Sequence, residues 1–427
     1  MHNDYRFDTL AVQAGYVPKP KEPRVLPLAQ STTFFYDDPE QLAHIFDLAE
    51  TGHMYSRISN PTVEAFENKI AALEGGVAAV ATSSGQAATT NALLNIVSCG
   101  EHIVASSALY GGSYALLAYT FKKLGIEVTF IDPEADADTI KAAFRSDTKA
   151  LFAETISNPG MNVLDFGKFA AVAEETQVPL IVDNTFPTPY LCRPLELGAH
   201  IVIHSTSKYI DGHAAAIGGI IIDGGKFDWN NGRYPGLTEP DPSYHGISYT
   251  ESFGPAAYAV KARVQLIRDF GNVMSPFTAF LLNTSSETLG LRMEKHSQNA
   301  LALAEHLEQH PRVSWVNYPG LKSHPGYPLK EKYMPKGASG VLTFGLKGGL
   351  EACRQFQKNI KLAALVVHLG DSRTSILHPA TTTHRQLSEA EQLAAGVSPD
   401  LIRVSAGLED IRDLITDFDQ AIAASQP

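Results

Sequence analysis

Two short apolar stretches, each followed at once by polar residues, constrain this 427-residue chain more than any other feature. The first covers residues 179–182 and ends at Asp183, and the second covers residues 199–203 and leads to Ser205, Ser207 and Lys208. Short continuous apolar runs rich in β-branched residues are typical of buried parallel strands. Because α/β proteins bind ligands at the carboxyl ends of such strands, these side chains are expected to face one crevice.

An acid, two hydroxyls and an amine in one crevice suit a Schiff-base cofactor. A lysine amine condenses with the aldehyde of pyridoxal phosphate, and a carboxylate beside the ring nitrogen keeps that nitrogen protonated. Hydroxyl groups on the lysine loop are suitable phosphate ligands. A solvated surface lysine is the competing interpretation, and the local residues leave both open. Residues 205–208 also match the S-x-x-K of penicillin-binding enzymes, but the S-D-N and K-T-G partner motifs do not occur in the sequence.

Composition limits the class of protein. The formal charge of −12 disfavours a nucleic-acid or anionic-membrane partner, and 44% hydrophobic with 19% charged residues is an ordinary globular balance. The three cysteines, Cys99, Cys192 and Cys353, are far apart and predict neither a disulfide framework nor a zinc site. No histidine set has metal-ligand spacing. Without a signal-like apolar segment, these features predict a cytoplasmic protein that does not enter a membrane.

The order of patterns along the chain predicts three parts. Residues 1–60 are irregular and rich in proline, which indicates an arm that lies over something else. Alternating strand and helix patterns from about 61 to 225 predict a doubly wound, mostly parallel sheet in a large domain over 61–258. A smaller α+β domain is expected over 259–427, with a strand at 401–405 and helices near 350–359 and 388–395. The aromatic-rich segment 223–254 is expected to be an ordered loop.

Weaker signals point toward the same crevice. Residues 82–88 read as a strand, a small-residue turn and a helix start, which is a ready anion site because free backbone N–H groups point outward there. A helix cap is the plainer interpretation of this segment. Arg57 follows Tyr55 on a loop and is either a surface charge or a phosphate clamp. Tyr110 is either a core residue or, because glycines follow it, a ring that lies flat on a planar ligand.

Taken together, the motifs of this chain are highly specific. They are YSRISNPT, SSGQAA, LYGG, VDNTF, HSTSKYIDGH, HPATTTH and RVSAGLED, together with the segment holding Glu154 and Asn158. Over nearly its whole length the chain resembles the pyridoxal-phosphate enzymes of the trans-sulfuration (Cys/Met metabolism) family. The resemblance implies fold type I, the aspartate-aminotransferase-like α/β fold, and a homotetramer built from tight dimers.

The resemblance also implies roles for individual residues. Lys208 matches the Schiff-base lysine, Asp183 the partner of the ring nitrogen, and Tyr110 the stacking tyrosine that assists as acid or base. Arg403 matches the arginine that binds the substrate carboxylate, with Tyr55 and Arg373 expected near the substrate. The remaining matches are cofactor contacts: Gly85, Gln86, Ser205, Ser207 and Asn158, with Tyr55 and Arg57 given by the neighbouring subunit.

Three departures from the family pattern indicate the sulfhydrylase branch. Arg373 stands where lyases and cystathionine-forming members have glutamate, Gly112 stands where methionine γ-lyases typically have cysteine, and the long insert contains GLTEPDPSYHG. The implied reaction replaces the acetyl group of O-acetylhomoserine by sulfide or methanethiol. Alternatives are an O-succinylhomoserine sulfhydrylase, a cystathionine γ-synthase and a C–S lyase of the same family. A non-catalytic interaction protein is disfavoured because all the expected site residues are present.

Overall fold

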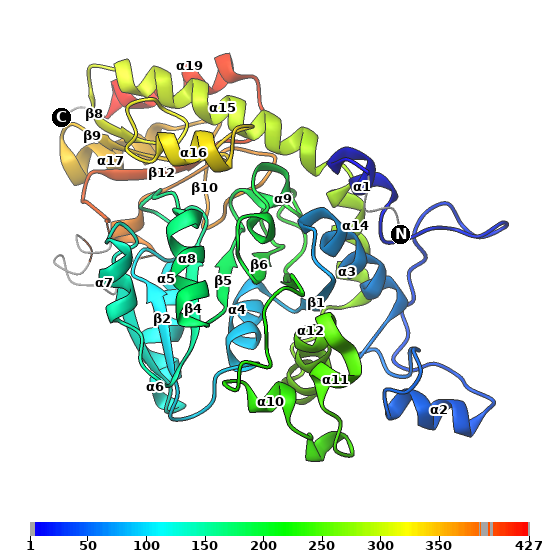
Figure 1. Ribbon diagram of the computed structural model, residues 1–427. Coiled ribbons are helices and arrows are strands. Elements are labelled where there is room, and N and C mark those ends of the chain that lie inside the picture. The colour runs from blue at the N-terminus through cyan, green and yellow to red at the C-terminus, as the bar shows by residue number, and fades with distance from the viewer. Residues whose placement is uncertain (1–4, 384, 386–391, 393–395, 426–427) are drawn as a thin grey trace.

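The larger of two sheets organises residues 78–223 of the computed structural model, which describes residues 5–383, 385, 392 and 396–425 (Figure 1). Within these residues its strand order is β1-β7-β6-β5-β4-β2-β3. The bounds are β1 Ala78–Thr82, β2 His102–Ser106, β3 Glu127–Ile131, β4 Thr148–Glu154, β5 Leu180–Asp183, β6 Ile201–Ser205 and β7 Gly219–Asp223. Strands β2 to β6 pair in parallel, and β7 runs antiparallel to both its neighbours. The mostly parallel sheet predicted from the sequence is confirmed.

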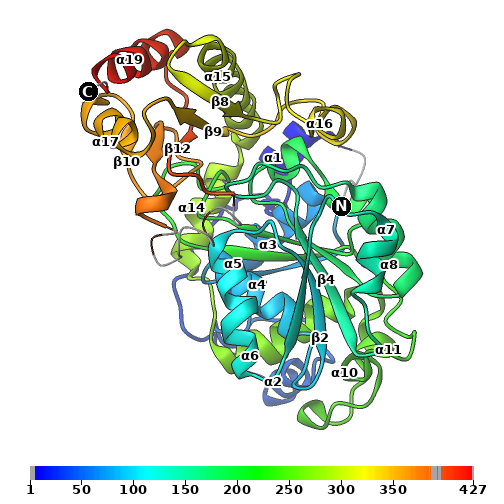
Figure 2. The ribbon, with the colours of Figure 1, turned by 90° about the vertical axis from the view of Figure 1, so that its left-hand side faces the viewer.

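Both faces of this sheet are buried, which is why its strands read as continuous apolar runs. Val182 and Val202 lie in a core shared with α3 (Pro61–Glu74) and α8 (Phe166–Thr176). Ile181 and Ile203 lie in a second core, shared with α4 (Gly85–Leu94). Figure 2 shows α8 and α7 (Ala137–Ala142) on one side of the sheet and α4, α5 (Gly111–Ala115) and α6 (Phe121–Lys123) on the other.

The second sheet belongs to the smaller, C-terminal part of the chain. Its order is β10-β11-β12-β9-β8, with bounds β8 Val313–Asn317, β9 Val341–Leu346, β10 Ala364–Leu365, β11 Ser375–Leu377 and β12 Leu401–Ser405. Helices α17 (Gly349–Asn359) and α19 (Ile411–Ala424) pack with this sheet around Phe344, Phe356 and Phe418. The strand predicted at 401–405 and the helix predicted at 350–359 are present. The helix predicted near 388–395 lies, apart from Gln392, outside the described residues.

Helix α15 (Leu289–Gln309) connects the two parts of the chain (Figure 1). Its residues Leu289 and Met293 lie in a core of the large sheet, whereas Leu303 and Leu307 lie in the core of the small one. The division expected at residue 258 falls inside α12 (Ala257–Lys261), and Tyr258 is buried beside the large sheet. The two cores therefore meet along α15. No helix among the described residues combines the length and apolarity needed to cross a membrane.

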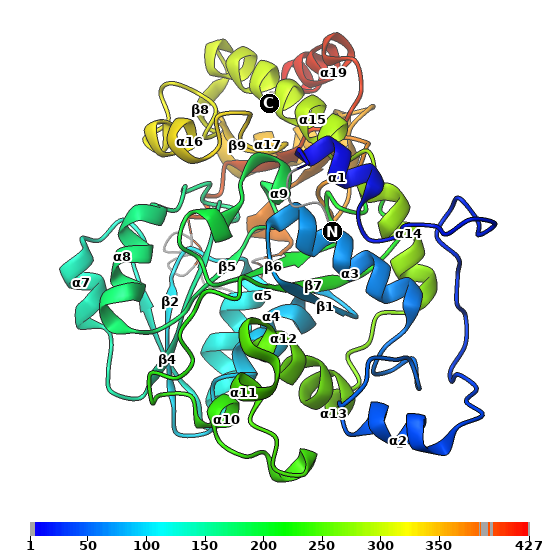
Figure 3. The same ribbon diagram turned by 45° about the vertical axis from the view of Figure 1, so that its right-hand side comes forward.

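The N-terminal segment divides into a packed and an outlying portion. Helix α1 (Phe7–Gln13) packs against α3 and α15 of its own chain, whereas α2 (Pro39–Phe46) stands away from the body (Figures 1 and 3). Large apolar side chains are exposed along the outlying portion, with Phe35 90% and Val25 60% accessible. Exposed apolar residues gathered on one segment are a feature of interaction surfaces.

Residues 223–254 form an ordered insert, as their aromatic content predicts. Trp229 stacks on Tyr258 with ring centroids 5.3 Å apart, which fixes the insert to the large sheet. Two short helices follow, α10 (Pro235–Thr238) and α11 (Tyr249–Phe253). Asp241 accepts a hydrogen bond from the Tyr249 hydroxyl at 2.6 Å and so ties the end of the insert to its middle.

Candidate active site

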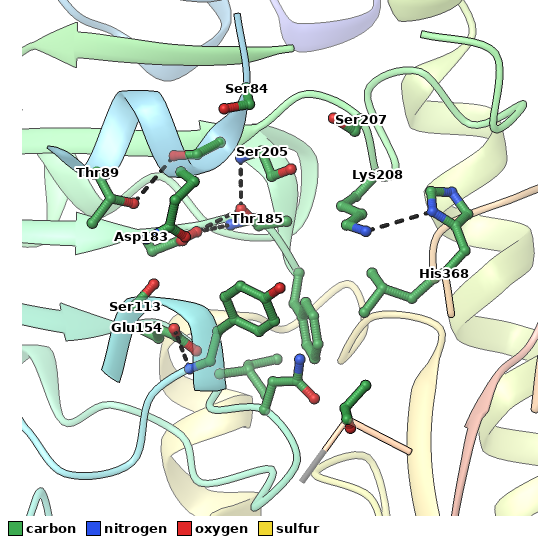
Figure 4. A pocket seen from close by; sticks show the side chains of 18 of the residues that line it. Ser84, Thr89, Ser113, Glu154, Asp183, Thr185, Ser205, Ser207, Lys208 and His368 are labelled. Carbon is green, nitrogen blue, oxygen red and sulfur yellow. Dashed lines mark hydrogen bonds between the residues drawn. The ribbon is translucent and has the colours of Figure 1, made fainter. Parts of the chain in front are cut away.

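A cavity lies at the carboxyl ends of β4, β5 and β6, with residues 367–369 of the small domain on its other side (Figure 4). Residues predicted from the sequence that line it are Gly85, Gln86, Tyr110, Asn158, Asp183, Ser205, Ser207, Lys208 and Arg403. Ser84, Glu154, Thr185 and His368 line it as well. The strand ends that were expected to share one crevice do share it, because β5 and β6 are adjacent and parallel.

Asp183 ends strand β5 and points into the cavity. Its Oδ1 accepts hydrogen bonds from the Thr185 backbone N–H at 2.9 Å and from the Thr185 hydroxyl at 2.5 Å. Burial raises the pKa of Asp183, and the Thr185 hydrogen bonds act against that rise. A cation next to this carboxylate would favour its charged form and oppose the rise of its pKa. The site therefore suits a protonated ring nitrogen.

Lys208 lies on the turn that follows β6, and its amine faces the small domain (Figure 4). Burial, and secondly the positive charge of Arg403, lower the pKa of Lys208 to about 8. A lysine with a lowered pKa has a larger fraction of neutral, nucleophilic amine near neutrality. Gly370 allows the small domain to approach: a Cβ there would lie 2.7 Å from the Tyr209 backbone nitrogen.

The first turn of α4 and the turn after β6 form a small-residue cradle. Ser84 caps α4, with its hydroxyl accepting from the Ala87 N–H at 3.1 Å. Gly85 must lack a side chain, since a Cβ there would lie 2.5 Å from Cβ of Ser205. The hydroxyls of Ser205 and Ser207 line the same end of the cavity. Free helix N–H groups and hydroxyls together make an anion site that fits a phosphate.

Tyr110 and Glu154 are joined at the opposite wall. Glu154 accepts a hydrogen bond from the Tyr110 backbone N–H at 2.7 Å, and burial raises the pKa of this carboxyl well above its usual range. The Tyr110 ring is 50% exposed and lines the cavity. A Cβ at Gly112 would lie 2.5 Å from the Tyr110 ring, so any side chain at 112 would displace the ring.

Arg403 enters the cavity from β12 of the small domain and is 7% exposed. Burial lowers its pKa to about 10, which still leaves the guanidinium charged near neutrality. It donates hydrogen bonds to Asn158 Oδ1 at 3.3 Å and to the His368 carbonyl at 3.2 Å. Both acceptors are neutral, and a planar guanidinium is well suited to pair with a carboxylate ligand.

The structure leaves Tyr55, Arg57 and Arg373 outside the cavity lining. Arg57 lies 5.5 Å from the Tyr55 ring centroid and donates to the Arg268 carbonyl at 2.7 Å. Arg373 is 72% exposed and pairs with Asp371 at 2.9 Å. The place of Arg373 beside the substrate stays a prediction; within this chain Asp371, two residues earlier, pairs with its guanidinium at the surface.

His368 and Thr185 are cavity residues that sequence reasoning did not single out. Thr185 was within the VDNTF motif, where a hydroxyl two residues after an acid is a recognisable turn signal. His368 lies in a loop between β10 and β11, where neither periodicity nor a turn motif marks it.

The donor set as a whole fits pyridoxal phosphate. Lys208 would hold the aldehyde carbon, Asp183 the ring nitrogen, and the turn of Gly85, Ser205 and Ser207 the phosphate. The close approach of Gly85, at the start of α4, to Ser205 is the structural observation that favours a phosphate there, because a Cβ on residue 85 would lie 2.5 Å from Cβ of Ser205 and fill this cradle.

Comparison with known proteins agrees with this fit. Residues 8–423 match the family model described as Cys/Met metabolism PLP-dependent enzyme. The chain is 47% identical over 432 residues to "O-acetyl-L-homoserine sulfhydrylase" of Leptospira meyeri, covering 99% of this chain and 98% of that protein. It is also 47% identical over 420 residues to "O-acetyl-L-homoserine sulfhydrylase 1" of Thermus thermophilus, covering 98% and 100% of the two chains.

Solved structures show the same similarity. A crystal structure of a candidate O-acetylhomoserine (thiol)-lyase from Campylobacter jejuni, which carries N'-pyridoxyl-lysine-5'-monophosphate, superposes with a TM-score of 0.95 at 38% identity and covers 98% of this chain and all of that one (100%). The fold is therefore the predicted one, fold type I. On its sequence, its fold and its cavity, the chain belongs to the Cys/Met metabolism family of pyridoxal-phosphate-dependent enzymes.

Proposed function

We propose that this enzyme replaces the acetyl group of O-acetyl-L-homoserine with sulfide, giving L-homocysteine and acetate, and that methanethiol serves in place of sulfide to give methionine. The observation that carries the proposal is that Lys208 and Arg403 line one cavity. The lowered pKa of Lys208 leaves part of its amine neutral, whereas Arg403 is a buried cation. Relatives that match nearly the whole chain at 43–47% identity bear sulfhydrylase or homocysteine synthase names. These residues and these relatives are consistent with an amino-acid substrate that has a leaving group at Cγ.

Each side chain has a task in this reaction. Arg403 binds the substrate carboxylate, and its hydrogen bond to Asn158 fixes the guanidinium. When bound, pyridoxal phosphate supplies an electron sink that makes the protons of the substrate acidic. Lys208 removes the proton at Cα and the proton at Cβ, and Asp183 keeps the ring nitrogen protonated. Tyr110, which lines the same cavity, would cover the cofactor ring and assist a proton transfer.

The residue at position 112 supports replacement over elimination. Methionine γ-lyases typically have cysteine there, whereas this chain has Gly112, and a side chain at that position would displace the Tyr110 ring. The competing reaction, a C–S lyase, releases ammonia and a keto acid. The alternatives that differ in the acyl group or in the nucleophile, O-succinylhomoserine sulfhydrylase and cystathionine γ-synthase, use the same residues and are separated by substrate preference.

Product analysis tests the proposal. Purified protein is incubated with O-acetyl-L-homoserine and sulfide, and homocysteine, acetate and ammonia are measured together. We expect equal amounts of homocysteine and acetate and little ammonia. Ammonia released in equal amount with acetate would contradict the proposal and would show that the enzyme is a lyase. O-succinyl-L-homoserine in a parallel reaction shows whether the acetyl group is preferred.

We further propose that the enzyme is a cytoplasmic homotetramer of tight dimers, in which the N-terminal segment of one subunit completes the cavity of its neighbour. The exposed apolar side chains of that segment, among them Phe35 and Phe46, support such an assembly. Free cysteines are in keeping with a reducing compartment. Mass measured in solution by light scattering tests the assembly: a monomer at micromolar concentration would contradict it.

A further inference from the structure

Arg57 rests on a turn of helix from a distant part of its own chain. A π-helical stretch, Ala262–Ile267, continues into the short helix α13 (Arg268–Phe270), which Figure 3 shows at the same end of the molecule as α2. The Arg268 carbonyl accepts a hydrogen bond from Arg57 at 2.7 Å, and Arg263 donates to the Ile58 carbonyl at 3.2 Å. Short π-helical stretches are rare and are frequent at functional sites.

The insert of residues 223–254 holds this helical turn in place. The Tyr244 hydroxyl donates to the Val264 carbonyl at 3.1 Å, and Asp241 accepts a hydrogen bond from the side-chain amide of Gln265. The guanidinium carbon of Arg268 lies 4.9 Å from the centroid of the Tyr244 ring, within the range of a cation–π interaction. Because these contacts act on closely spaced residues, the direction of the Arg268 carbonyl depends on the insert.

The insert also contacts the N-terminal segment ahead of Arg57. Asp47, at the end of α2, lies 3.5 Å from His245 of the insert, and Leu48 packs against the core that contains Tyr244. The ion pair is exposed and contributes little, so the apolar contact of Leu48 is the firmer of the two. The stretch from residue 47 to residue 57 is therefore attached to the insert at one end and to the helical turn at the other.

Arg57 keeps N–H groups available for a ligand. It is exposed, and within the described part of the chain its one hydrogen bond goes to the Arg268 carbonyl. Its guanidinium carbon also lies 5.5 Å from the centroid of the Tyr55 ring. An arginine that rotates freely loses much of its rotamer freedom when it binds, and contacts that fix it beforehand lower that cost. The Arg268 carbonyl is such a contact.

We propose that the insert is a positioning element for the cofactor site of the neighbouring subunit, with Tyr244 as its principal residue. Tyr244 holds the Arg268 side chain, and the Arg268 carbonyl orients Arg57. Arg57 then pairs with the phosphate bound in the neighbouring cavity, a charge-assisted contact that suits a guanidinium. Neither Tyr244 nor Arg268 lines the cavity of its own chain, so both act through Arg57. The inference rests on the proposed assembly, in which the N-terminal segment completes the cavity of its neighbour.

Hybrid oligomers separate the subunit that binds the cofactor from the subunit that gives Arg57. Subunits carrying Arg57→Ala are reassembled with subunits carrying Lys208→Ala, so that only a cavity shared between the two kinds has both residues. Pyridoxal phosphate is titrated into the cofactor-free hybrid, and the visible absorbance of cofactor bound to Lys208 is recorded. The shared cavity should appear as a high-affinity phase, binding roughly a hundredfold more tightly than the cavities that lack Arg57.

Tyr244→Leu is then placed on one kind of subunit at a time. On the Lys208→Ala subunit, which gives Arg57, it should weaken the high-affinity phase by about tenfold, because the arginine remains but is no longer oriented. On the Arg57→Ala subunit the same substitution should leave that phase unchanged. A general loss of structure would not depend in this way on which subunit carries the substitution.

Three further variants sharpen the comparison. Tyr234→Leu is the matched control, because Tyr234 is also a buried tyrosine of the insert with a cation near its ring, Lys149 at 5.5 Å, but its hydroxyl donates to the Lys149 carbonyl. It should leave the high-affinity phase unchanged from either subunit. Tyr244→Phe keeps the ring face and should retain most of the affinity. Arg268→Met removes the cation from a partly exposed position and should weaken binding as Tyr244→Leu does.

The outcomes distinguish the inference from the assembly on which it rests. A high-affinity phase that Tyr244→Leu and Arg268→Met leave intact, or weaken equally from both kinds of subunit, would overturn the role of the insert while the shared cavity stands. Absence of any high-affinity phase in the hybrid without further substitution would overturn the shared cavity itself, and the inference with it.

Discussion

Arg403 donates a hydrogen bond to Oδ1 of Asn158 at 3.3 Å and so joins strand β12 of the small domain to the loop that follows β4 of the large one. The guanidinium is buried, yet the two acceptors to which it donates within the described part of the chain, this amide and the His368 carbonyl, are neutral. A buried cation without a compensating charge is costly, and an anionic ligand removes that cost. The two domains are therefore connected at the point where a substrate carboxylate would bind.

Arg403→Lys tests this role. Lysine keeps the charge but loses the fork that binds a carboxylate through two parallel hydrogen bonds. Hydrogen bonds to charged groups contribute about 1.5–3 kcal/mol each, so kcat/KM for O-acetylhomoserine should fall on the order of a hundredfold, mainly through KM. Steady-state kinetics give the answer. A loss below threefold would mean that another residue binds the carboxylate.

Arg373→Glu is expected to have little effect on the choice of nucleophile. The Arg373 side chain is 72% exposed and lies outside the cavity lining, so solvent screens its charge from a bound nucleophile. Homocysteine and cystathionine are measured with sulfide and cysteine in competition, and the ratio should change less than threefold. A change of tenfold or more toward cystathionine would return Arg373 to the substrate site, which in that case must be formed with a neighbouring subunit.

Mixed oligomers test whether active sites are shared. Arg57 stands outside the cavity of its own chain, on the segment with exposed apolar residues. Arg57→Ala and Lys208→Ala subunits should each be inactive alone. After the two are dissociated and reassembled together, activity should return in part, because one kind of hybrid site has both residues intact. Hybrids verified by mass that stay inactive would indicate that each site is built from a single chain.

The site residues that could be located from the sequence are all marked by local signals. Asp183 and Lys208 follow continuous apolar runs, and such runs are read reliably because burial on both faces of a sheet leaves few other compositions. Gly85 was located because helix starts have their own residue preferences. These signals are local, and each lies within a few residues of the side chain that it locates.

The positions of other side chains depend on contacts that a local sequence pattern does not show. His368 gains its position from Arg403 and from the turn at Gly370, neither of which is visible in a loop sequence. Arg373 was assigned from its place in a motif, but Asp371 directs its side chain outward. The domain division at 258 stays a prediction, and in the structure helix α15 contributes residues to the cores of both sheets.

His296 makes folding stability depend on pH. It is fully buried, its Nδ1 lies 2.7 Å from the Ala406 carbonyl, and burial lowers its pKa to about 4. A histidine in the unfolded chain takes up a proton near pH 6.5, so protonation favours unfolding by up to about 1.4 kcal/mol for each pH unit below that value. The loss is fully developed once the pH has fallen through about 4.

Urea unfolding of His296→Gln measures that contribution. Between pH 6.5 and pH 5 the free energy of unfolding should fall less in the variant than in the unsubstituted protein, by up to about 2 kcal/mol. The comparison of slopes removes any constant cost of the substitution. An identical pH dependence for the two proteins would mean that His296 is already protonated in the folded chain.

The central claim is that Lys208 is the residue that carries the cofactor, and peptide mapping after borohydride reduction tests it most directly. Lys261 is the matched comparison, because burial also lowers its pKa to about 8, but its amine donates to the Asn95 carbonyl at 2.7 Å and does not line the cavity. The reduced protein is digested and the mass of the cofactor is located. The account predicts that mass on the peptide containing Lys208 alone; finding it on Lys261 or on any other lysine would contradict the account.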